Sequence, residues 1–318
     1  MLDLLQIKTI LVTGGGGFIG SNFLNKYVVD LPEIRFINLD ILTYAANLNN
    51  IKVSEASNYK FIQGDICDID FLDSLFTTMA IDAVIHFAAE SHVDLSIKNP
   101  KIFIETNVIG THNLLEISRK YSIKRFHHVS TDEVYGSLGN TGYFTEESPI
   151  NPSSPYSASK AGSDHLVNAY HQTFALNTTL SRCSNNYGPY QDTTKLIPKF
   201  ISLLTSERKV PLYKDGKNVR DWLFVKDHIE AIWCIFSKAK SSSIYNIGGN
   251  NEKSNSEITQ ILLENFGKDE SYIDYVADRP GHDFRYAIDA SKIKKELGWE
   301  PIYTFEKGIK ETIKFYTR

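Results

Sequence analysis

Two side chains capable of proton transfer stand four residues apart in the stretch "PYSASKAGSDHLVNAY", which begins at Pro155. Pro155 is typical of a helix start, and Tyr156 and Lys160 then share one face of that helix. A lysine ammonium beside a phenol favours the phenolate and lowers the pKa of the phenol. Such a tyrosine can take the proton of a sugar hydroxyl as hydride leaves the same carbon, with Ser130 or Thr131 as a third partner. The same spacing also occurs on exposed helices, so this interpretation requires a dinucleotide site nearby.

A pair of adjacent acids, Asp132 and Glu133, follows the apolar segment "KRFHHVS". Two carboxylates repel each other when both are buried and ionised, and a half-desolvated crevice drives their pKa values apart. One carboxyl can then hold a proton while its neighbour accepts one, which is what an elimination reaction needs. The alternative is a pair of solvated acids after a strand, and we expect the pair to be functional.

The stretch "LVTGGGGFIGS", residues 11–21, follows a predicted strand and opens a predicted helix. Gly15, Gly17 and Gly20 fit the spacing G-x-G-x-x-G, and Gly14, Gly17 and Gly20 fit a looser G-x-x-G-x-x-G. Glycine allows the backbone to turn tightly and approach a pyrophosphate at the helix N-terminus. A glycine cluster alone can be a simple turn, but the flanking strand and helix favour a dinucleotide site.

An acid ends the second predicted strand, as a dinucleotide site requires. Asp40 lies 20 residues after Gly20, where a carboxylate accepts hydrogen bonds from a ribose diol. No arginine follows at once in "DILTY", so the sequence favours NAD over NADP. Asp65 and Ile66 end the third strand and are candidates to border the adenine.

Short β-branched segments alternate with helical patterns through residues 1–183 and predict a Rossmann-type, doubly wound parallel α/β sheet. Ligands then bind where the carboxyl ends of the strands meet. Residues 184–318 are richer in turns and predict a smaller α+β substrate lobe, with residues 225–250 returning to the first domain. The expected strands are 8–14, 35–40, 59–65, 82–89, 124–130 and 177–183, with 245–249 as an additional strand, and the expected helices are 18–31, 68–79, 100–121, 156–175, 195–207, 225–239, 254–267 and 304–316.

The composition argues against several classes of protein. The 318 residues are 42% hydrophobic and 23% charged, with a net charge of −4, so we expect a globular protein that binds no nucleic acid. Three cysteines, Cys67, Cys183 and Cys234, show no metal-like spacing and fit a reducing cytosol. Because this spacing is not typical of metal ligands, we expect no metal site. We find no apolar run long enough to span a membrane and no signal peptide, and therefore expect a cytoplasmic protein.

The motifs together identify a family. "TGGGGFIG" and "YSASK" resemble the extended short-chain dehydrogenase/reductases, and more narrowly the nucleoside-diphosphate-glucose 4,6-dehydratases. The resemblance continues through "LTYAANLNN", "FAAESHVDLSI", "STDEVYG", "RCSNNYGPYQ", "NVRDWLFVKDH" and "DRPGHDFRYAID". It implies bound NAD and dTDP-glucose as the substrate, which would become dTDP-4-keto-6-deoxyglucose.

The same resemblance implies a role for each residue of the catalytic set. Tyr156 would take the proton of the C4 hydroxyl while C4 gives hydride to NAD. Glu133 would remove the C5 proton, and a protonated Asp132 would donate to the departing C6 oxygen before the hydride returns to C6. Thr131 would hydrogen-bond the C4 oxygen, and Lys160 would also bind the nicotinamide ribose.

The resemblance further implies two sets of binding residues. The cofactor set is Gly14, Gly17, Phe18, Ile19, Gly20, Asp40, Thr43, Asp65, Ile66, Ala88, Ala89, Thr106, Tyr156 and Lys160. The substrate set is Ser91, Asn185, Asn186, Lys195, Leu196, Tyr213, Arg220, Asn255, Arg279 and His282. Arginine forks suit diphosphate oxygens. A homodimer through a four-helix bundle of 100–121 and 156–175 is also implied, with Ile104, Val108, Leu115, Leu166 and Ala169 as candidate contacts.

Some positions depart from the family pattern and leave alternatives open. Asp192, Thr193 and Thr194 replace an aromatic residue, proline and glutamate in a loop near the nucleotide, so UDP- or CDP-glucose is an alternative substrate. Leu95, Lys214 and Phe284 also depart from the pattern. A nucleotide-sugar 4-epimerase needs Tyr156 and Lys160 but no acid–base pair. A UDP-glucuronate decarboxylase or a non-enzymatic NAD-binding regulator fits the catalytic set less well.

Overall fold

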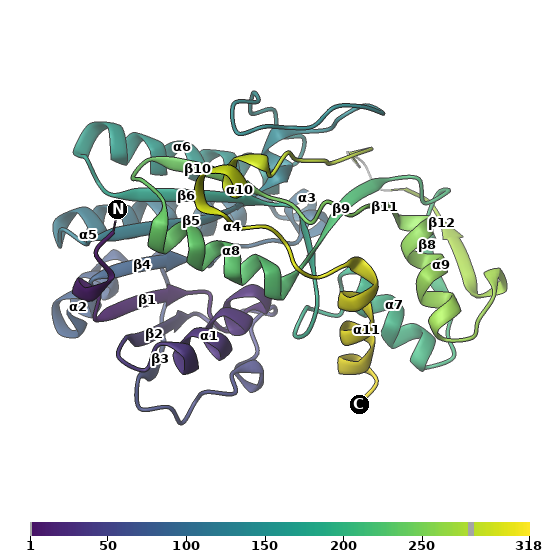
Figure 1. Cartoon of the computed structure of the whole chain (residues 1–318), viewed down its shortest axis with the longest axis horizontal. Helices are drawn as coiled ribbons and strands as arrows, with labels where there is room; N and C mark the ends of the chain where they lie inside the picture. The colour runs from purple at the N-terminus through teal and green to yellow at the C-terminus, as the bar shows by residue number, and fades with distance from the viewer. Residues whose placement is uncertain (1, 279–282) are drawn as a thin grey trace.

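The computed structural model of the chain describes residues 2–278 and 283–318. Its centre is a seven-stranded sheet in the order β10-β6-β5-β4-β1-β2-β3, in which every pair is parallel (Figure 1). The strands are β1 (Thr9–Thr13), β2 (Arg35–Asp40), β3 (Tyr59–Gln63), β4 (Ala83–His86), β5 (Arg125–Thr131), β6 (Thr178–Cys183) and β10 (Ser243–Ile247). The predicted Rossmann-type sheet is confirmed.

The central strands are buried on both faces because helices cover the sheet from each side. Helices α1 (Phe18–Asp30) and α8 (Val225–Lys238) pack over one face, where Phe23 and Ile232 meet alternate strand residues such as Ile10. On the other face, α2 (Ile69–Met79), α5 (Thr111–Lys120) and α6 (Pro155–Phe174) share a second core. Successive residues of β1 alternate between these cores, which fixes the register of the sheet.

The predicted helix 100–121 is continuous but not uniform. It begins as α4 (Pro100–Phe103), widens to a π-helix over Ile104–Gly110 and continues as α5. The short helix α3 (Val93–Lys98) precedes it. The buried Asn107 lies in the widened segment, where its amide bonds to the backbone of Glu90 and to Ser159 Oγ. Widened turns of this kind often mark functional sites, and periodicity could not predict this one.

A smaller lobe is built mainly from the C-terminal part of the chain, with its own hydrophobic core (Figure 1). Strands β7 (Asn185–Tyr187), β9 (Val219–Phe224) and β11 (Glu252–Ser254) form one sheet, and β8 (Val210–Tyr213) pairs with β12 (Ile273–Val276). Helices α7 (Leu196–Thr205), α9 (Asn255–Asn265) and α11 (Phe305–Tyr316) pack around them. Helix α10 (Ser291–Leu297) instead packs against α8 and β10 of the larger layer.

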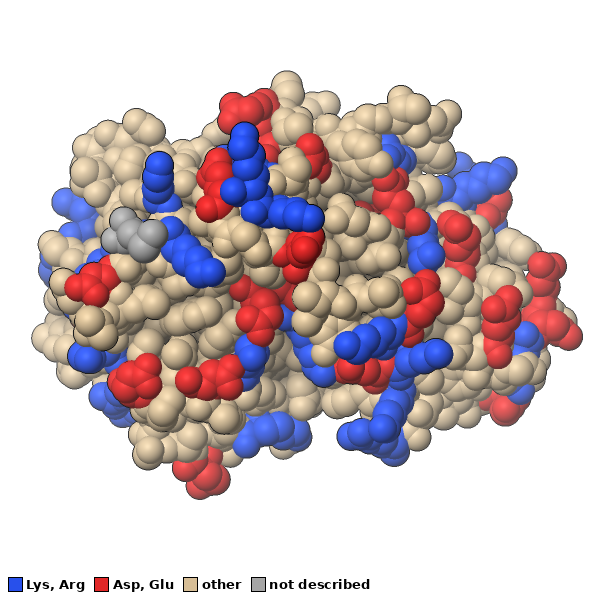
Figure 2. All heavy atoms as spheres, in the orientation of Figure 1, with Lys and Arg blue, Asp and Glu red and all other residues tan. Residues whose placement is uncertain are grey.

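The surface is polar and mixed in charge. Acidic and basic side chains are interspersed over the face shown in Figure 2. The chain also carries exposed ion pairs such as Lys26–Asp30. Exposed pairs of this kind contribute little to stability. None of the helices in the described part of the chain has the length and hydrophobicity that a bilayer crossing requires.

Candidate active site

A cavity of about 710 Å³ lies at the carboxyl edge of the large sheet. Its walls come from the residues that follow β1, β2, β3, β4, β5 and β6, together with the π-helix, α6 and the loop before α7. Parallel strands deliver their carboxyl ends to one edge, so residues far apart in sequence meet there. Every residue of the predicted cofactor and catalytic sets lines this cavity.

The glycine loop fits closely against its neighbours. Gly14 has φ +71°, and a Cβ atom there would lie 2.6 Å from the backbone nitrogen of Ala88. A Cβ atom at Gly20 would lie 2.7 Å from the Cα atom of Gly15. Gly17 is the N-cap of α1 and has no side chain to cap it, so the first turn of the helix opens towards the cavity. This arrangement fits the pyrophosphate of a dinucleotide.

Asp40 ends β2 on the same wall and is almost fully buried. Its Oδ2 accepts a hydrogen bond from Gly16 N at 2.9 Å, and its Oδ1 accepts one from Leu42 N at 2.8 Å. Burial raises the pKa of Asp40, and the two backbone donors oppose the rise. Each oxygen keeps a further lone pair for a ribose hydroxyl. The residues therefore fit the NAD that the sequence implies.

The adjacent acids occupy the end of β5. They begin a 3-10 helix, Asp132–Tyr135, whose N-cap is Thr131: its hydroxyl accepts a hydrogen bond from Glu133 N at 3.3 Å. Asp132 is 2% exposed, and its Oδ2 has no hydrogen-bond partner among the described residues. Burial raises the pKa of Asp132 well above its ordinary value, and the nearby charges of Glu133 and Asp221 raise it further. Asp132 is thus suited to carry a proton.

Helix α6 presents the tyrosine and the lysine. It starts at a capping box of Ser154 and Ser157 with proline in its first turn, as the sequence predicts. Burial, then the charge of Glu133, raises the pKa of Tyr156 well above that of a free phenol. The sequence-based expectation of a lowered phenol pKa is therefore wrong for this structure. The physical reason is that the Lys160 ammonium donates to Val129 O at 2.9 Å, and burial dominates at the phenol.

Four of the predicted substrate residues also reach the cavity: Ser91, Asn185, Asn186 and Lys195. The Lys195 ammonium donates to Ser91 O at 3.1 Å, which joins the loop before α7 to the loop after β4. Asn186 Oδ1 lies 2.9 Å from Nδ1 of the buried His228, whose pKa burial lowers to about 3. The neutral imidazole therefore donates to Asn186 and fixes the orientation of its amide.

The other predicted substrate residues lie outside the lining of the cavity or outside the described residues. Arg220 donates to the backbone oxygens of Val219 and Asp283, and its guanidinium lies 4.4 Å from the centre of the Tyr286 ring. Its charge still lowers the pKa of Asp132. Leu196 begins α7, Tyr213 ends β8 and Asn255 begins α9. Arg279 and His282 fall outside the described residues.

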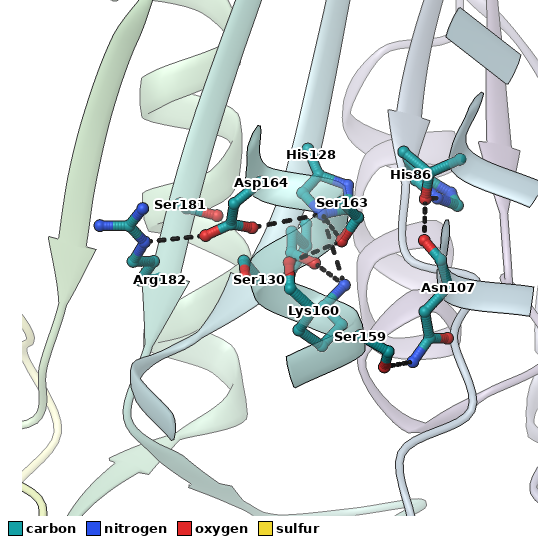
Figure 3. A network of polar contacts seen from close by, with 12 residues as sticks. His86, Asn107, His128, Ser130, Ser159, Lys160, Ser163, Asp164, Ser181 and Arg182 are labelled. Atoms are coloured by element: carbon teal, nitrogen blue, oxygen red, sulfur yellow. Dashed lines mark hydrogen bonds and ion pairs between the residues drawn. The ribbon is translucent and has the colours of Figure 1, made fainter. Parts of the chain in front are cut away.

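Sequence reasoning missed residues that support the site. Glu90 lines the cavity, and the amide of Asn107 holds its backbone while also donating to Ser159 Oγ at 2.8 Å. His128, Asp164 and Arg182 form a buried network behind Lys160 (Figure 3). The only signal was the occurrence of charged residues in segments otherwise predicted to be buried. In the described part of the chain, no His, Cys, Asp and Glu cluster is arranged to hold a metal ion.

Comparison with known proteins identifies close relatives. The family described as GDP-mannose 4,6 dehydratase matches residues 11–312. The dTDP-glucose 4,6-dehydratase of Xanthomonas campestris pv. campestris is 52% identical, over 98% of this chain and 93% of that protein. The dTDP-glucose 4,6-dehydratase of Streptomyces venezuelae, solved with NAD and TDP bound, has a TM-score of 0.94 and 46% identity, over 97% of this chain and 96% of that one.

A related enzyme of a different reaction class has nearly the same structure. The UDP-glucose 4-epimerase of Thermotoga maritima, solved with UDP-glucose, has a TM-score of 0.90 and 29% identity, over 97% of this chain and 98% of that one. Fold alone therefore does not separate a dehydratase from an epimerase, and the side chains at the cavity must be considered.

Proposed function

The chain belongs to the nucleotide-sugar 4,6-dehydratase family, and we propose that its cavity dehydrates dTDP-glucose to dTDP-4-keto-6-deoxyglucose. It is an NAD-dependent hydro-lyase. The observation that carries the proposal is the pair Asp132 and Glu133 on the same cavity wall as Tyr156. An epimerase needs the tyrosine but has no use for an acid and a base across C5 and C6.

NAD is the cofactor. When bound, it would supply the hydride acceptor for oxidation at C4 and the hydride donor for reduction at C6. The glycine loop and the first turn of α1 would hold the pyrophosphate. The carboxylate of Asp40 would accept hydrogen bonds from the adenosine ribose, and Asp65 and Ile66 would border the adenine. A fixed carboxylate at this position repels a 2′-phosphate, which supports the preference for NAD.

Tyr156 is proposed to remove the C4 hydroxyl proton, with Thr131 bonding the same oxygen. The support is that both side chains line the cavity and that Thr131 lowers the otherwise raised pKa of the phenol through a hydrogen bond. A neutral phenol cannot accept a proton, so Tyr156 must be ionised before it acts as the base, and a nearby positive charge favours the phenolate. Lys160 supplies a side-chain cation on this wall, and its pKa, lowered by burial to about 8, leaves it charged at neutral pH.

Glu133 is proposed to take the C5 proton and Asp132 to protonate the leaving C6 oxygen. The raised pKa of Asp132 supports this order of roles because a buried neutral acid is ready to donate. Protons balance over the proposed steps: Tyr156 holds the proton of the C4 hydroxyl, Asp132 has given its proton to the departing water, and Glu133 returns its proton to C5. A transfer from Tyr156 to Asp132 therefore resets the enzyme after the water leaves.

The smaller lobe is proposed to bind the nucleotide diphosphate, with residues 184–318 as the substrate domain and residues 1–183 as the NAD domain, to which residues 225–250 return. The position of Asn185, Asn186 and Lys195 on the cavity wall supports this assignment. Arg220, Asn255 and the remaining predicted residues would complete the substrate site from farther along the lobe. Asp192 and Thr194 also line the cavity, so this loop is the place where the nucleobase preference would be set.

One incubation tests the function. The purified protein is mixed with dTDP-, UDP- or CDP-glucose, and the product is followed by its alkaline absorbance and identified by NMR. We expect a 4-keto-6-deoxy product from dTDP-glucose at the highest kcat/KM. A C4 epimer as the sole product would overturn the dehydratase assignment, and faster turnover of UDP- or CDP-glucose would overturn the assigned base.

We further propose a cytoplasmic homodimer built on the 100–121 and 156–175 helices. The support is apolar exposure along them: Ile104 is 47% exposed and Phe174 is 48% exposed, and neither lines the cavity. Leu115, a candidate contact from the sequence, is fully buried in the core of its own chain and cannot serve. Sedimentation of the wild type and of an Ile104→Glu, Phe174→Glu variant tests the assembly, and a wild type that stays monomeric at all concentrations would refute it. Cell fractionation tests the compartment.

A further inference from the structure

Three charged or titratable side chains that the proposed mechanism does not use lie buried behind Lys160 (Figure 3). Asp164, Arg182 and His128 are 1%, 3% and 0% exposed and come from α6, β6 and β5. None of them lines the cavity, whereas Lys160 does. Burying ionised groups is unfavourable unless they compensate one another, so this cluster requires an explanation.

Arg182 fixes one oxygen of the Asp164 carboxylate. Its Nε donates to Asp164 Oδ2 at 2.9 Å, and one terminal nitrogen donates to Tyr135 OH at 2.9 Å. Tyr135 in turn donates to Asn246 Oδ1 at 2.8 Å, which anchors the arginine from the far side. The other oxygen, Asp164 Oδ1, has no hydrogen-bond partner among the described residues and faces His128 Nε2 at 3.6 Å. The free side of the carboxylate is therefore turned towards His128 Nε2, which also lies 3.5 Å from the Lys160 ammonium.

His128 is neutral, and the surrounding hydrogen bonds define its tautomer. The Ser163 hydroxyl donates to Lys160 O at 2.8 Å, so its oxygen accepts from His128 Nε2 at 3.1 Å. The proton then sits on Nε2, and Nδ1 has no partner in the described part of the chain. Burial, followed by the charge of Lys160, holds the pKa of His128 well below its ordinary value. A neutral ring that donates its N–H to Ser163 carries no negative charge, so it cannot balance the charge of Lys160.

Lys160 donates to Val129 O at 2.9 Å, and its ammonium lies 3.5 Å from His128 Nε2. Burial lowers its pKa to about 8, while Asp164, and less strongly Cys183, act in the opposite direction. Burial also raises the pKa of Cys183 to about 12, so the thiol is uncharged near neutral pH. The other titratable groups near the cluster are His86 on β4, His127 on β5, Tyr135 and Tyr156, all neutral at this pH in the free protein.

We propose that Asp164, anchored by Arg182, is a positioning residue that keeps the Lys160 ammonium charged and directed along β5 at the edge of the cavity. The anion is four residues after Lys160, one turn along α6, so helix geometry delivers it to the same face. The consequence for catalysis rests on the proposed function, in which the charge of Lys160 supports Tyr156. The electrostatic coupling of Asp164 to Lys160 does not rest on that function.

The coupling is tested by titrating Lys160 directly. Protein with ¹³C-labelled lysine is followed by NMR without substrate, and a Lys160→Arg variant assigns the resonance. In the wild type we expect Lys160 to be protonated at neutral pH. In Asp164→Asn we expect its pKa to fall by about one pH unit or more, since the opposite charge one helical turn away is lost. Asp274→Asn, which removes an exposed acid on β12, should change nothing.

Kinetics with dTDP-glucose then separate positioning from packing. In Asp164→Asn, the alkaline limb of the kcat/KM profile should move to lower pH by the same number of pH units as the pKa of Lys160. At pH values where Lys160 is charged in the wild type but neutral in the variant, kcat/KM should then be about tenfold lower in the variant. Asp164→Glu keeps the negative charge and should restore the limb. A loss of rate that is equal at every pH, or an unchanged Lys160 titration, would overturn the proposal.

The coupling of Asp164 to Lys160 can be tested even if the Asp164→Asn variant does not fold. If Asp164→Asn does not fold, the wild-type titration still decides, because a Lys160 that is neutral at pH 7 contradicts the proposed role. If the wild type makes no 4-keto-6-deoxy sugar, the proposed function fails while the titration still reports whether Asp164 and Lys160 are coupled. The two failures are therefore distinguishable.

Discussion

The two ends of the cavity, where the cofactor and the reacting sugar are proposed to bind, are lined by different kinds of atoms. At the cofactor end, the walls are backbone: glycines approach Ala88 and each other closely, and both oxygens of Asp40 accept backbone hydrogen bonds. At the chemical end, the walls are polar side chains. Buried atoms of Ser130, Asp132, Ser184 and Asn185 have no hydrogen-bond partner among the described residues.

The difference indicates that the cofactor end contributes to the stability of the fold, whereas the chemical end carries the reactive groups. Buried polar atoms without partners destabilise a fold, and they persist in native proteins mainly where function requires them. At the cofactor end, close backbone packing and the backbone hydrogen bonds to Asp40 hold the site, so changes there should disturb the fold and NAD binding together. The chemical end carries groups that await a substrate, so changes there should abolish turnover while leaving the fold intact or more stable.

The largest expected effect is at the chemical end. Glu133→Gln removes the proposed base while keeping its shape, and we expect kcat with dTDP-glucose to fall by about 10³-fold, the range typical of lost acid–base catalysis. Reduction of the bound NAD should persist, because C4 oxidation does not use Glu133. Exchange of the C5 proton with deuterium from solvent, followed by NMR, should vanish. Full turnover by this variant would remove Glu133 from the mechanism.

The next effect is at the cofactor end. Gly20→Ala places a Cβ atom 2.7 Å from Gly15 Cα, inside van der Waals contact, so the loop must shift. We expect unfolding to become easier by roughly 1–3 kcal/mol, as for overpacked cores, with weaker NAD binding. Gly139→Ala is a matched control because a Cβ atom there meets nothing within 4 Å. Equal denaturation midpoints for the two variants would contradict the close approach.

The cofactor end could be predicted from the sequence, and much of the chemical end could not. Glycine spacing and the acid after the second strand are local signals, since the fold itself places them together. By contrast, the support of Lys160 by Asp164 and Arg182 depends on two elements, α6 and β6, meeting in space. The predicted lowering of the Tyr156 pKa was wrong because spacing along a helix does not report the direction of a long lysine side chain or the degree of burial.

A smaller effect is expected on the pH dependence of the unfolding free energy, and it arises from Asp132. Folding raises the pKa of Asp132 above its ordinary value of 3.8, so the folded state holds the proton more tightly than the unfolded chain. The stability that this proton contributes is therefore fully present below pH 3.8 and is lost as the pH rises towards the pKa of the folded state. The loss is about 1.4 kcal/mol for each pH unit that separates the folded and unfolded pKa values.

Asp132→Asn removes this decline because an amide does not titrate. We expect the unfolding free energy of the variant, relative to the wild type, to increase from acid to neutral pH, although the variant turns over dTDP-glucose far more slowly. Urea melts at several pH values measure the difference. A pH-independent difference would show that Asp132 is not a buried, protonated acid.

The smallest predicted effect concerns the loop before α7, which contains Gln191. It tests whether this loop takes part in the chemical step or only helps to bind the substrate. The Tyr316 hydroxyl of α11 donates to the backbone oxygen of Gln191, in the loop that lines the cavity before α7. Tyr316→Phe removes one hydrogen bond, about 1 kcal/mol, without touching any proposed catalytic group. We expect the KM for dTDP-glucose to rise a few-fold with kcat unchanged, while Tyr275→Phe, at a side chain that is 61% exposed, leaves both constants as they were. If kcat falls instead, the loop takes part in the chemical step, and the boundary between the two ends of the cavity must be moved to include α11.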